Sequence, residues 1–169
     1  MISLIVINRT FAITFGIGLL LVASLVAFVL HQQRGAHLEW RGSVLKVRTA
    51  QIDETSTLMI IDFRLSNPAA YPIIVRTIDL EMQAADGTVA NGVPIAASDA
   101  DRMFSYYKLL GPQYNPVMRE QDSVAPGASL DRMTAFRLAA PFADVERRKG
   151  ITLRLGDSSG RVSADLSAH

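Results

Sequence analysis

The fold is decided by residues 71–84, which read YPIIVRTIDLEMQA. Apolar and polar side chains alternate along this stretch, which is the pattern of a β-strand with one buried and one exposed face. We expect a buried face of Ile74, Ile78, Leu80 and Met82, opposite an exposed face of Thr77, Asp79 and Glu81. Asp86 and Gly87 follow, and because both residue types tolerate positive φ they predict a hairpin turn into a returning strand over residues 88–97.

Further strands are predicted on both sides of this hairpin. Upstream, residues 42–52 and 55–68 are rich in β-branched and aromatic residues, and the second segment ends in an Asn-Pro dipeptide. Downstream, the Pro-Gly dipeptide at residues 126–127 predicts a turn, and residues 151–166 read as a terminal hairpin with its loop at residues 156–160. Many short strands without alternating helices favour an all-β, Ig-like antiparallel β-sandwich.

One segment, residues 98–110, departs from this pattern and predicts a short inserted helix. Ser98 is a typical helix N-cap, and Asp99 and Asp101 suit the positively polarised first turn. The apolar face of this helix, which would pack on the sandwich, comprises Met103, Phe104, Tyr107 and Leu110. We therefore expect a β-sandwich domain over residues 38–169 with a helical insertion at about 98–110.

A different kind of segment lies near the N-terminus. Residues 11–30 read FAITFGIGLLLVASLVAFVL, without a charge, an amide or a proline. Twenty residues form a helix about 30 Å long, which matches the hydrocarbon core of a bilayer. The alternatives are a buried core helix, disfavoured because no amphipathic period is visible, and a cleaved signal peptide, whose apolar run is usually shorter. We expect a tail at 1–10, a transmembrane helix in the lipid bilayer at 11–30 and a linker at 31–37.

The orientation of this helix has two interpretations. Arg9 is the one basic side chain before it, whereas four follow within about 20 residues, so the positive-inside rule places the domain in the cytoplasm. A short N-terminal tail with the whole domain behind the anchor is instead the usual signal-anchor layout, and folded domains translocate largely regardless of charge. We favour the second interpretation, an extracytoplasmic and periplasmic domain.

The composition argues against several kinds of chemistry. The chain has no cysteine, which excludes disulfides, thiolate catalysis and cysteine-ligated metals. The histidines at positions 31, 37 and 169 show no metal-ligand spacing. Without a recognisable pair of nucleophile and base, we expect no enzyme activity and no cofactor, and a hydrolase or transferase is disfavoured.

Charge also limits the partners. The chain has 17 basic residues; removing Arg9, which precedes the apolar segment, leaves 16 against 16 acidic ones, and this neutral domain predicts no nucleic-acid partner. Asp99 and Asp101 could bind a cation together with Asp122 or Glu120 if the loop folds back. We favour instead a charge-complemented helix start. Residues 146–149, Glu-Arg-Arg-Lys, could meet anionic lipid heads, but a solvated loop is the favoured interpretation.

The most suggestive feature is a group of aromatic and methionine side chains in and after the predicted helix. Tyrosine and methionine are favoured at protein interfaces because they combine apolar area with a polar or adaptable edge. The side chains that we expect at a partner surface are Met103, Tyr106, Tyr107, Tyr114 and Met118. The alternative is that the helix packs Phe104 and Tyr107 over an open end of the sandwich.

The apolar segment offers a second candidate contact. Small residues fall on one side of the helix with small-xxx-small spacing, which allows two helices to approach closely. These residues are Ala12, Gly16, Ala23 and Ala27. In a segment this rich in small residues, chance alone can produce the same spacing.

Two stretches carry a resemblance to known domains. Residues 63–82, FRLSNPAAYPIIVRTIDLEM, are a strand ending in Asn-Pro followed by a second strand. Residues 123–141, SVAPGASLDRMTAFRLAAP, place a Pro-Gly turn before a strand. This layout resembles the Ig-like sandwiches of late-embryogenesis-abundant type 2 and telokin-like domains found behind bacterial membrane anchors. The resemblance spans most of residues 38–166 and implies an extracytoplasmic accessory or binding module without catalytic residues.

The sequence therefore predicts a membrane-tethered, non-enzymatic interaction or envelope-accessory module. Its protein partner would contact residues 98–118, and the identity of that partner is not encoded in any motif. The alternative function is that of a small structural subunit of a larger membrane complex, which associates through its transmembrane helix.

Overall fold

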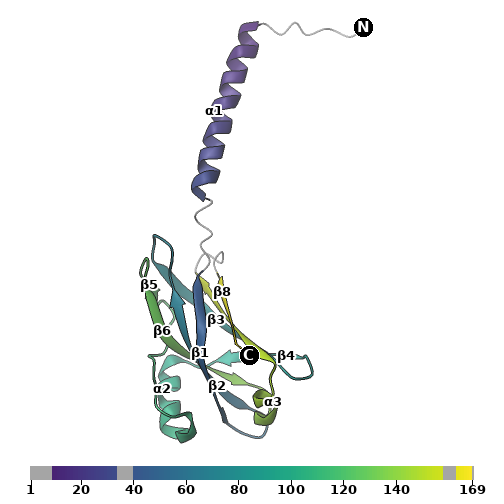
Figure 1. Cartoon of the computed structure of the whole chain (residues 1–169), viewed down its shortest axis with the longest axis vertical. Coiled ribbons are helices and arrows are strands. Elements are labelled where there is room, and N and C mark those ends of the chain that lie inside the picture. The colour runs from purple at the N-terminus through teal and green to yellow at the C-terminus, as the bar shows by residue number, and fades with distance from the viewer. Residues whose placement is uncertain (1–8, 34–39, 158–162, 169) are drawn as a thin grey trace. The chain divides into compact units, whose positions relative to one another are not determined.

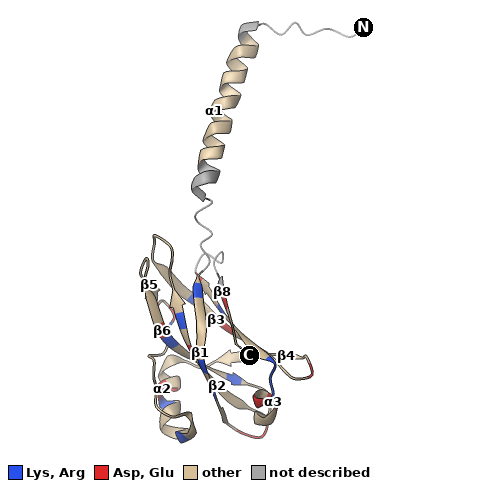
Figure 2. Ribbon diagram, in the orientation of Figure 1, with Lys and Arg blue, Asp and Glu red and all other residues tan. Residues whose placement is uncertain are grey.

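The computed structural model of the chain describes residues 9–33, 40–157 and 163–168, and it divides into two units at residue 37. The first unit contains helix α1 (Arg9–Gln33) (Figure 1). Its window Phe11–Phe28 is long and apolar enough to cross a membrane, and no other helix in the described residues is. The part of α1 that is drawn in tan carries no charged residue (Figure 2). The predicted linker begins inside this helix, and its remainder lies outside the described residues.

The second unit is mostly β-structure. Its strands are β1 (Arg41–Gln51), β2 (Thr57–Ser66), β3 (Ile73–Gln83), β4 (Val89–Pro94), β5 (Ser123–Val124), β6 (Ser129–Leu138), β7 (Gly150–Asp157) and β8 (Ser163–Ala168). Its helical elements are α2 (Ala97–Tyr106), the 3-10 helix η1 (Lys108–Leu110) and α3 (Phe142–Glu146). The all-β class and the helical insertion are confirmed, whereas α3 was not predicted.

The strands form one nearly closed antiparallel sheet. They pair in the order β1-β2-β6-β4-β3-β7-β8, and β5 pairs with β3. The two end strands, β1 and β8, approach each other closely at Gly42. A methyl group on Gly42 would lie 2.4 Å from the backbone oxygen of Arg64 and 2.9 Å from a side-chain carbon of Leu166 in β8. The sheet is therefore barrel-like, and the predicted Ig-like sandwich of two separate sheets is not confirmed.

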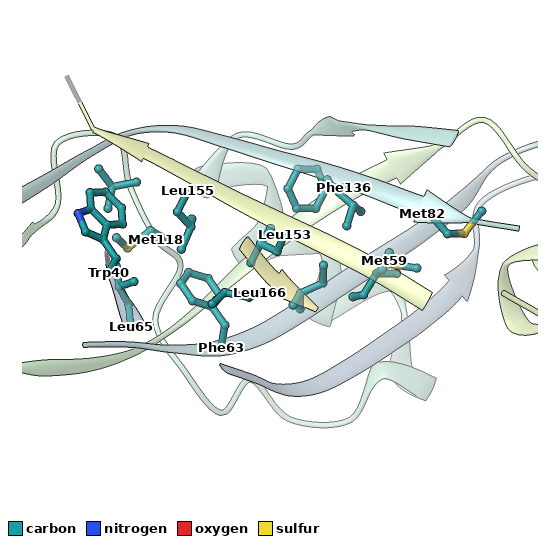
Figure 3. Close-up of a cluster of buried hydrophobic side chains, with 14 of the residues drawn as sticks. Trp40, Met59, Phe63, Leu65, Met82, Met118, Phe136, Leu153, Leu155 and Leu166 are labelled. Carbon is teal, nitrogen blue, oxygen red and sulfur yellow. The ribbon is translucent and has the colours of Figure 1, made fainter. Parts of the chain in front are cut away.

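The larger hydrophobic cluster is enclosed by this sheet. It draws side chains from β2, β3, β6, β7 and β8, and Figure 3 shows them converging from strands on opposite sides. Its largest fully buried members include Phe63, Leu65, Leu80, Met82, Phe136 and Leu153. Because these side chains come from distant parts of the sequence, their burial joins the whole sheet into one core.

A smaller cluster covers the other face of β1, β2 and β6. There, α2 and the segment that follows it pack over Leu58, Ile60 and Ala135. Every residue of β2 from Thr57 to Phe63 is consequently buried, with alternate side chains entering the two clusters. β2 is thus a central strand covered on both faces, which matches its nearly continuous apolar sequence.

The predicted faces of β3 are correct in one half of the strand only. Leu80 and Met82 are buried, as expected. In the other half, Ile73 and Val75 are buried while Ile74 is 36% exposed, so the prediction for Ile74 is wrong. The cause is a bulge, since the register with β7 shifts between Val75 and Thr77 and reverses the side on which the side chains point.

The predicted turns are confirmed where the structure describes them. Gly87 has φ of +93°, and Asp86 Oδ1 accepts hydrogen bonds from the backbone N–H of Thr88 at 2.9 Å and from its hydroxyl at 2.7 Å. Gly127 also has positive φ, at +68°. β7 and β8 form the predicted hairpin, whose loop after Asp157 lies outside the described residues.

The start of the inserted helix differs from the prediction. α2 begins at Ala97, so Ser98 lies inside the helix and does not cap it. The N-cap residue is Ala96, which provides no side-chain hydrogen bond. The predicted packing face is confirmed, because Leu110 is buried and Met103, Phe104 and Tyr107 pack against the smaller cluster.

Candidate functional site

A buried ion pair links β1 to β2 beneath the inserted segment. Arg48 Nη2 donates to Asp62 Oδ2 at 2.7 Å, and their side chains are only 6% and 3% exposed. Two charges can be buried at tolerable cost only when they are paired and their remaining polar atoms are hydrogen-bonded. The surroundings of this pair should therefore supply further partners.

Those partners come from the segment after α2. Arg48 Nη1 donates to the carbonyl oxygens of Leu110 at 3.0 Å and Pro112 at 2.8 Å. Asn115 Nδ2 donates to the second carboxylate oxygen of Asp62 at 2.9 Å. The segment is also tied to α2, because Gln113 Nε2 donates to Asp101 Oδ1 at 2.9 Å. The ion pair thus fixes η1 and residues 111–115 against the sheet.

Aromatic rings complete this arrangement. The Arg48 guanidinium carbon lies 4.9 Å from the ring centroid of Phe104 and 5.3 Å from that of Tyr114. The Lys46 ammonium lies 5.0 Å from the centroid of the same Tyr114 ring. Cations over aromatic faces are attracted by the ring quadrupole, and this attraction is stronger where water is excluded. Tyr114 is therefore held in place by two cations from β1.

Three apolar or aromatic side chains project into solvent from the end of α2 and from the anchored segment that follows it. Tyr106 is 79% exposed, Leu109 97% and Tyr114 60%. We call these three residues the tyrosine–leucine surface. Leu109 was not predicted from the sequence. The signal for it was the pair Leu109-Leu110, because a short 3-10 turn on the sheet can bury only one of two adjacent leucines.

The other predicted surface residues lie deeper. Met118 is 4% exposed and belongs to the larger core cluster, where Figure 3 shows it at the same end as Trp40, so its place on a partner surface is wrong. Met103 and Tyr107 are half-buried and pack in the smaller cluster. Of the five predicted residues, Tyr106 and Tyr114 alone present exposed side chains.

The acidic side chains considered for a cation are not gathered at one point. Asp101 accepts the hydrogen bond from Gln113, whereas Asp122 accepts from the backbone N–H of Arg119 at 3.2 Å and from Arg132 Nε at 3.4 Å. Within the described residues, no three His, Asp or Glu side chains are positioned to hold a metal. His37 and His169, and the side chain of His31, lie outside those residues.

The charged run at residues 146–149 lies at the end of α3. Glu146 accepts a hydrogen bond from the Thr49 hydroxyl, and Arg147 pairs with Asp144 at 2.9 Å. Arg148 Nη1 donates to the carbonyl oxygen of Val145 at 2.9 Å. These contacts stabilise the C-terminal end of a short helix, where cationic side chains complement the exposed carbonyls.

The chain contains three short motifs of serine enzymes that were not predicted above. Residues 156–160, GDSSG, match G-x-S-x-G, but they connect two strands and not a strand to a helix, and the serines lie outside the described residues. Residues 43–46 and 105–108 match S-x-x-K. The first lies on strand β1 with both side chains exposed, and the second joins the end of α2 to η1 with both side chains exposed. None of the three has the structural context of its motif.

The carboxylates with shifted pKa values lie at turns and on the surface. Hydrogen bonds from the backbone and hydroxyl of Thr55 lower the pKa of Asp53, and those of Thr88 lower the pKa of Asp86 in the same way. The pKa of Asp131 is lowered by its hydrogen bonds from Arg64. Each shift stabilises an ionised carboxylate, so these three groups are structural and not poised for acid–base catalysis near neutral pH.

The small residues of α1 form a possible contact within the first unit. Ala12, Gly16, Ala23 and Ala27 all lie in the continuous helix, whose geometry places them on one side. Ala12, Ala23 and Ala27 are exposed and Gly16 is half-buried. The spacing that permits close approach of a second helix is therefore present on α1.

Comparisons with known proteins add little to this geometry. No protein-family model matches the chain, and no curated protein matches it significantly. Among solved structures, the chain is similar to a functionally unknown protein from Listeria monocytogenes EGD-e, with 10% sequence identity and a TM-score of 0.43. This similarity covers 78% of this chain and 77% of that chain. At such a score it supports no conclusion about fold or function.

Proposed function

We propose that this chain is a membrane-tethered, non-enzymatic interaction module that binds a protein partner through the tyrosine–leucine surface. The observation that carries the proposal is the combination of Tyr106, Leu109 and Tyr114, all largely exposed. Tyr106 ends α2, and the other two lie on the following segment, which a buried ion pair holds. All three lie within residues 106–114, and tyrosine is enriched in interaction sites.

The anchoring of the surface supports this function. A flexible loop must lose conformational freedom when it binds, whereas a segment already fixed by Arg48 and Asn115 loses little. Burying an arginine and an aspartate carries a desolvation cost, and in some proteins such a pair is retained because it specifies one conformation. The ion pair therefore preorganises the surface for its partner.

The tether and the orientation are parts of the same proposal. α1 spans the membrane, and the second unit lies outside the cytoplasm as an envelope-accessory module, in line with the signal-anchor layout of the sequence. The resemblance to late-embryogenesis-abundant type 2 and telokin-like domains, including their Ig-like fold, gives the same expectation. It is a weaker support than the geometry of the surface.

The partner surface can be tested by photo-crosslinking in cells. A photoreactive amino acid placed at Leu109 should give a discrete crosslinked product, as should one at Tyr106. Val89 on β4 is a matched control, because it is also an exposed apolar residue, at 61%, but lies on another element. Equal crosslinking from Val89 and Leu109, or a product from neither tyrosine–leucine position, would contradict the proposal.

The orientation requires a separate measurement. With a tag after His169, protease should digest the domain once the outer barrier alone is opened. Protection until the inner membrane is lysed would place the domain in the cytoplasm. That result would remove the envelope function but leave the partner surface to be judged by the crosslinking experiment.

A second candidate function is a subunit role in which α1 binds another transmembrane helix. The observation that favours it is the small-residue spacing on one side of α1. Gly16→Leu and Ala23→Leu would then abolish co-purification of the partner, whereas Leu109→Ser would not. The opposite result would support the tyrosine–leucine surface.

A further inference from the structure

Arg48 carries the one buried side-chain nitrogen or oxygen that has no hydrogen-bond partner among the described residues. Its Nη1 donates to two carbonyl oxygens and its Nη2 donates to Asp62 Oδ2, but its Nε makes no hydrogen bond. Buried donors are nearly always paired, because leaving one unpaired is costly, and more so on a charged group. The buried ion pair therefore contains an unpaired donor that needs an explanation.

The exposed pair of Arg64 and Asp131 shows which contact Arg48 lacks. Arg64 donates from Nε to Asp131 Oδ1 at 2.6 Å and from Nη2 to Oδ2 at 2.7 Å, so one guanidinium binds both carboxylate oxygens. Such two-fold contacts are favoured between arginine and a carboxylate, because the spacing of their atoms matches. Arg48 makes only the Nη2 half of this contact, at 2.7 Å. The acceptor that would complete it is Asp62 Oδ1.

Asp62 Oδ1 is already bound by Asn115, whose Nδ2 donates to it at 2.9 Å. Asn115 ends a segment that we call the strap, residues 111–115. The carbonyl oxygen of Pro112, also on the strap, accepts from Arg48 Nη1 at 2.8 Å. The strap thus binds the guanidinium at one nitrogen and takes the carboxylate oxygen that Arg48 Nε would otherwise bind.

The strap is attached by polar contacts and not by burial. Four of its five residues are exposed, and Asn115 is half-buried. In contrast, Leu110 before the strap and Val117 after it are only 3% and 8% exposed. Segments with few buried apolar contacts open locally at low free-energy cost. The strap can therefore detach while the chain on both sides of it stays in place.

We propose that the strap is a latch with two states. In the attached state, Asn115 binds Asp62 Oδ1 and Arg48 Nε is unpaired. In the released state, Asn115 leaves and Arg48 Nε donates to the same oxygen, which completes the two-fold contact. Release exchanges one hydrogen bond to this oxygen for another, so its cost is limited to the other contacts of the strap.

The two states differ at the tyrosine–leucine surface. Tyr114 lies on the strap, whereas Tyr106 and Leu109 precede it. The released state therefore lacks one of the three exposed side chains, and a partner that contacts Tyr114 would favour the attached state. This regulatory role rests on the proposed function, whereas the exchange of hydrogen bonds at Asp62 does not.

The test uses the full-length, ¹⁵N-labelled protein in detergent micelles, with Asn115→Ala as the main variant. The released fraction should rise roughly tenfold, as expected for the loss of a hydrogen bond to a charged group. Relaxation dispersion at the amides of Gln113 and Tyr114 measures this fraction. The Nε–H proton of Arg48 should move downfield at the same time, because it gains a hydrogen bond to a carboxylate.

Two other variants of the strap serve as controls. Gln113→Ala removes the hydrogen bond to Asp101 of α2 but leaves Asn115 in place, so it should change both signals much less. Tyr114→Leu removes a ring that lies near Arg48, and it measures how much of the shift of the Nε–H proton comes from that ring alone. Thermal unfolding checks that each variant is folded.

Two outcomes would overturn the proposal. In the first, the Arg48 Nε–H proton of Asn115→Ala keeps its wild-type position once the contribution of the ring is subtracted. In the second, Gln113→Ala releases the strap as much as Asn115→Ala does. These measurements need no partner, whereas crosslinking from Leu109 depends on one, so a failure of the latch is distinguishable from a failure of the proposed function.

Discussion

Two ion pairs on strand β2 have nearly the same hydrogen-bond lengths and very different surroundings. Asp62 pairs with Arg48 of β1 at 2.7 Å, and Arg64, two residues further along, pairs with Asp131 of β6 at 2.6 and 2.7 Å. The first pair is 6% and 3% exposed, the second 53% and 36%. The difference arises because the segment after α2 covers Asp62 and leaves Arg64 in solvent.

The comparison shows that the contribution of an ion pair to stability depends on whether the surrounding segment excludes water, and not on bond length. In water, the attraction between exposed charges is screened and is offset by the entropy lost in ordering two long side chains. In the covered pair, removing one partner leaves a charge without water and without a counter-ion. The same chemistry therefore contributes little to stability at one site, whereas at the other the loss of one partner is strongly destabilising.

The largest effect is expected for Arg48→Met, which keeps the volume of the side chain but leaves the buried Asp62 unpaired. We expect a loss of about 3–5 kcal/mol in the free energy of unfolding. Urea unfolding of the full chain in detergent, followed by circular dichroism, measures it. A loss no larger than that of Arg64→Met would show that water reaches the pair and that the two sites do not differ.

The double variant Arg48→Met, Asp62→Leu is the control for this interpretation. Because it removes both charges, it should recover much of the stability lost in the single variant. It should nevertheless release the segment after α2, since the carbonyls of Leu110 and Pro112 lose their donor. Faster amide exchange at η1 with nearly normal stability would separate these two roles of Arg48.

A smaller effect is expected for Asn115→Ala. This change removes the hydrogen bond to the second oxygen of Asp62 but leaves the ion pair intact. Hydrogen bonds to charged groups contribute about 1.5–3 kcal/mol, so the variant should lie between Arg48→Met and wild type in the same unfolding experiment. A loss equal to that of Arg48→Met would mean that the carboxylate needs both partners equally.

The exposed pair of Arg64 and Asp131 should be detectable in a titration of the Asp131 carboxylate. Hydrogen bonds from Arg64 lower the pKa of Asp131 in the folded chain, so the pair contributes stability above the unfolded pKa of about 3.9 and loses it as pH falls through the folded pKa. Arg64→Gln should raise the pKa of Asp131 towards its ordinary value in a carboxyl NMR titration. An unchanged pKa would mean that the pair does not persist in solution.

The smallest effect concerns the stability of the same Arg64→Gln variant at neutral pH. Both side chains of the pair are well exposed, so we expect a change within the error of an unfolding measurement, and smaller still at 1 M salt. A clear and salt-independent loss of stability would show that exposure is a poor guide to the contribution of this pair.

Local patterns predicted much of the fold. The strands, the two glycine turns and the apolar helix were predictable because alternation, turn residues and uninterrupted apolar length act over short distances in the chain. The nearly closed sheet could not be predicted, because β6 pairs with both β2 and β4, and no local pattern encodes such distant partners. The bulge after Val75 was also hidden, since Ile73, Ile74 and Val75 are equally apolar.

The candidate site was predictable in part. The tyrosines were apparent from composition, but Met118 was misplaced because its backbone follows β6, where its N–H donates to the Met133 carbonyl at 2.8 Å and its side chain enters the core. Ser98 appeared to be a cap because serine caps are frequent, although the helix begins one residue earlier. The pairing of Arg48 with Asp62 depends on the register between β1 and β2. This register could not be predicted from the sequence.

The contact between Gly42 and Leu166 determines when the domain can complete its folding during synthesis. The first and last strands of the sheet meet there, so the domain cannot close until its final residues have left the ribosome and, in the proposed orientation, have crossed the membrane. Until then, the inner face of the sheet is open and apolar, which is a state prone to aggregation. Biogenesis of this protein therefore includes an interval in which an almost complete domain leaves its apolar inner face uncovered.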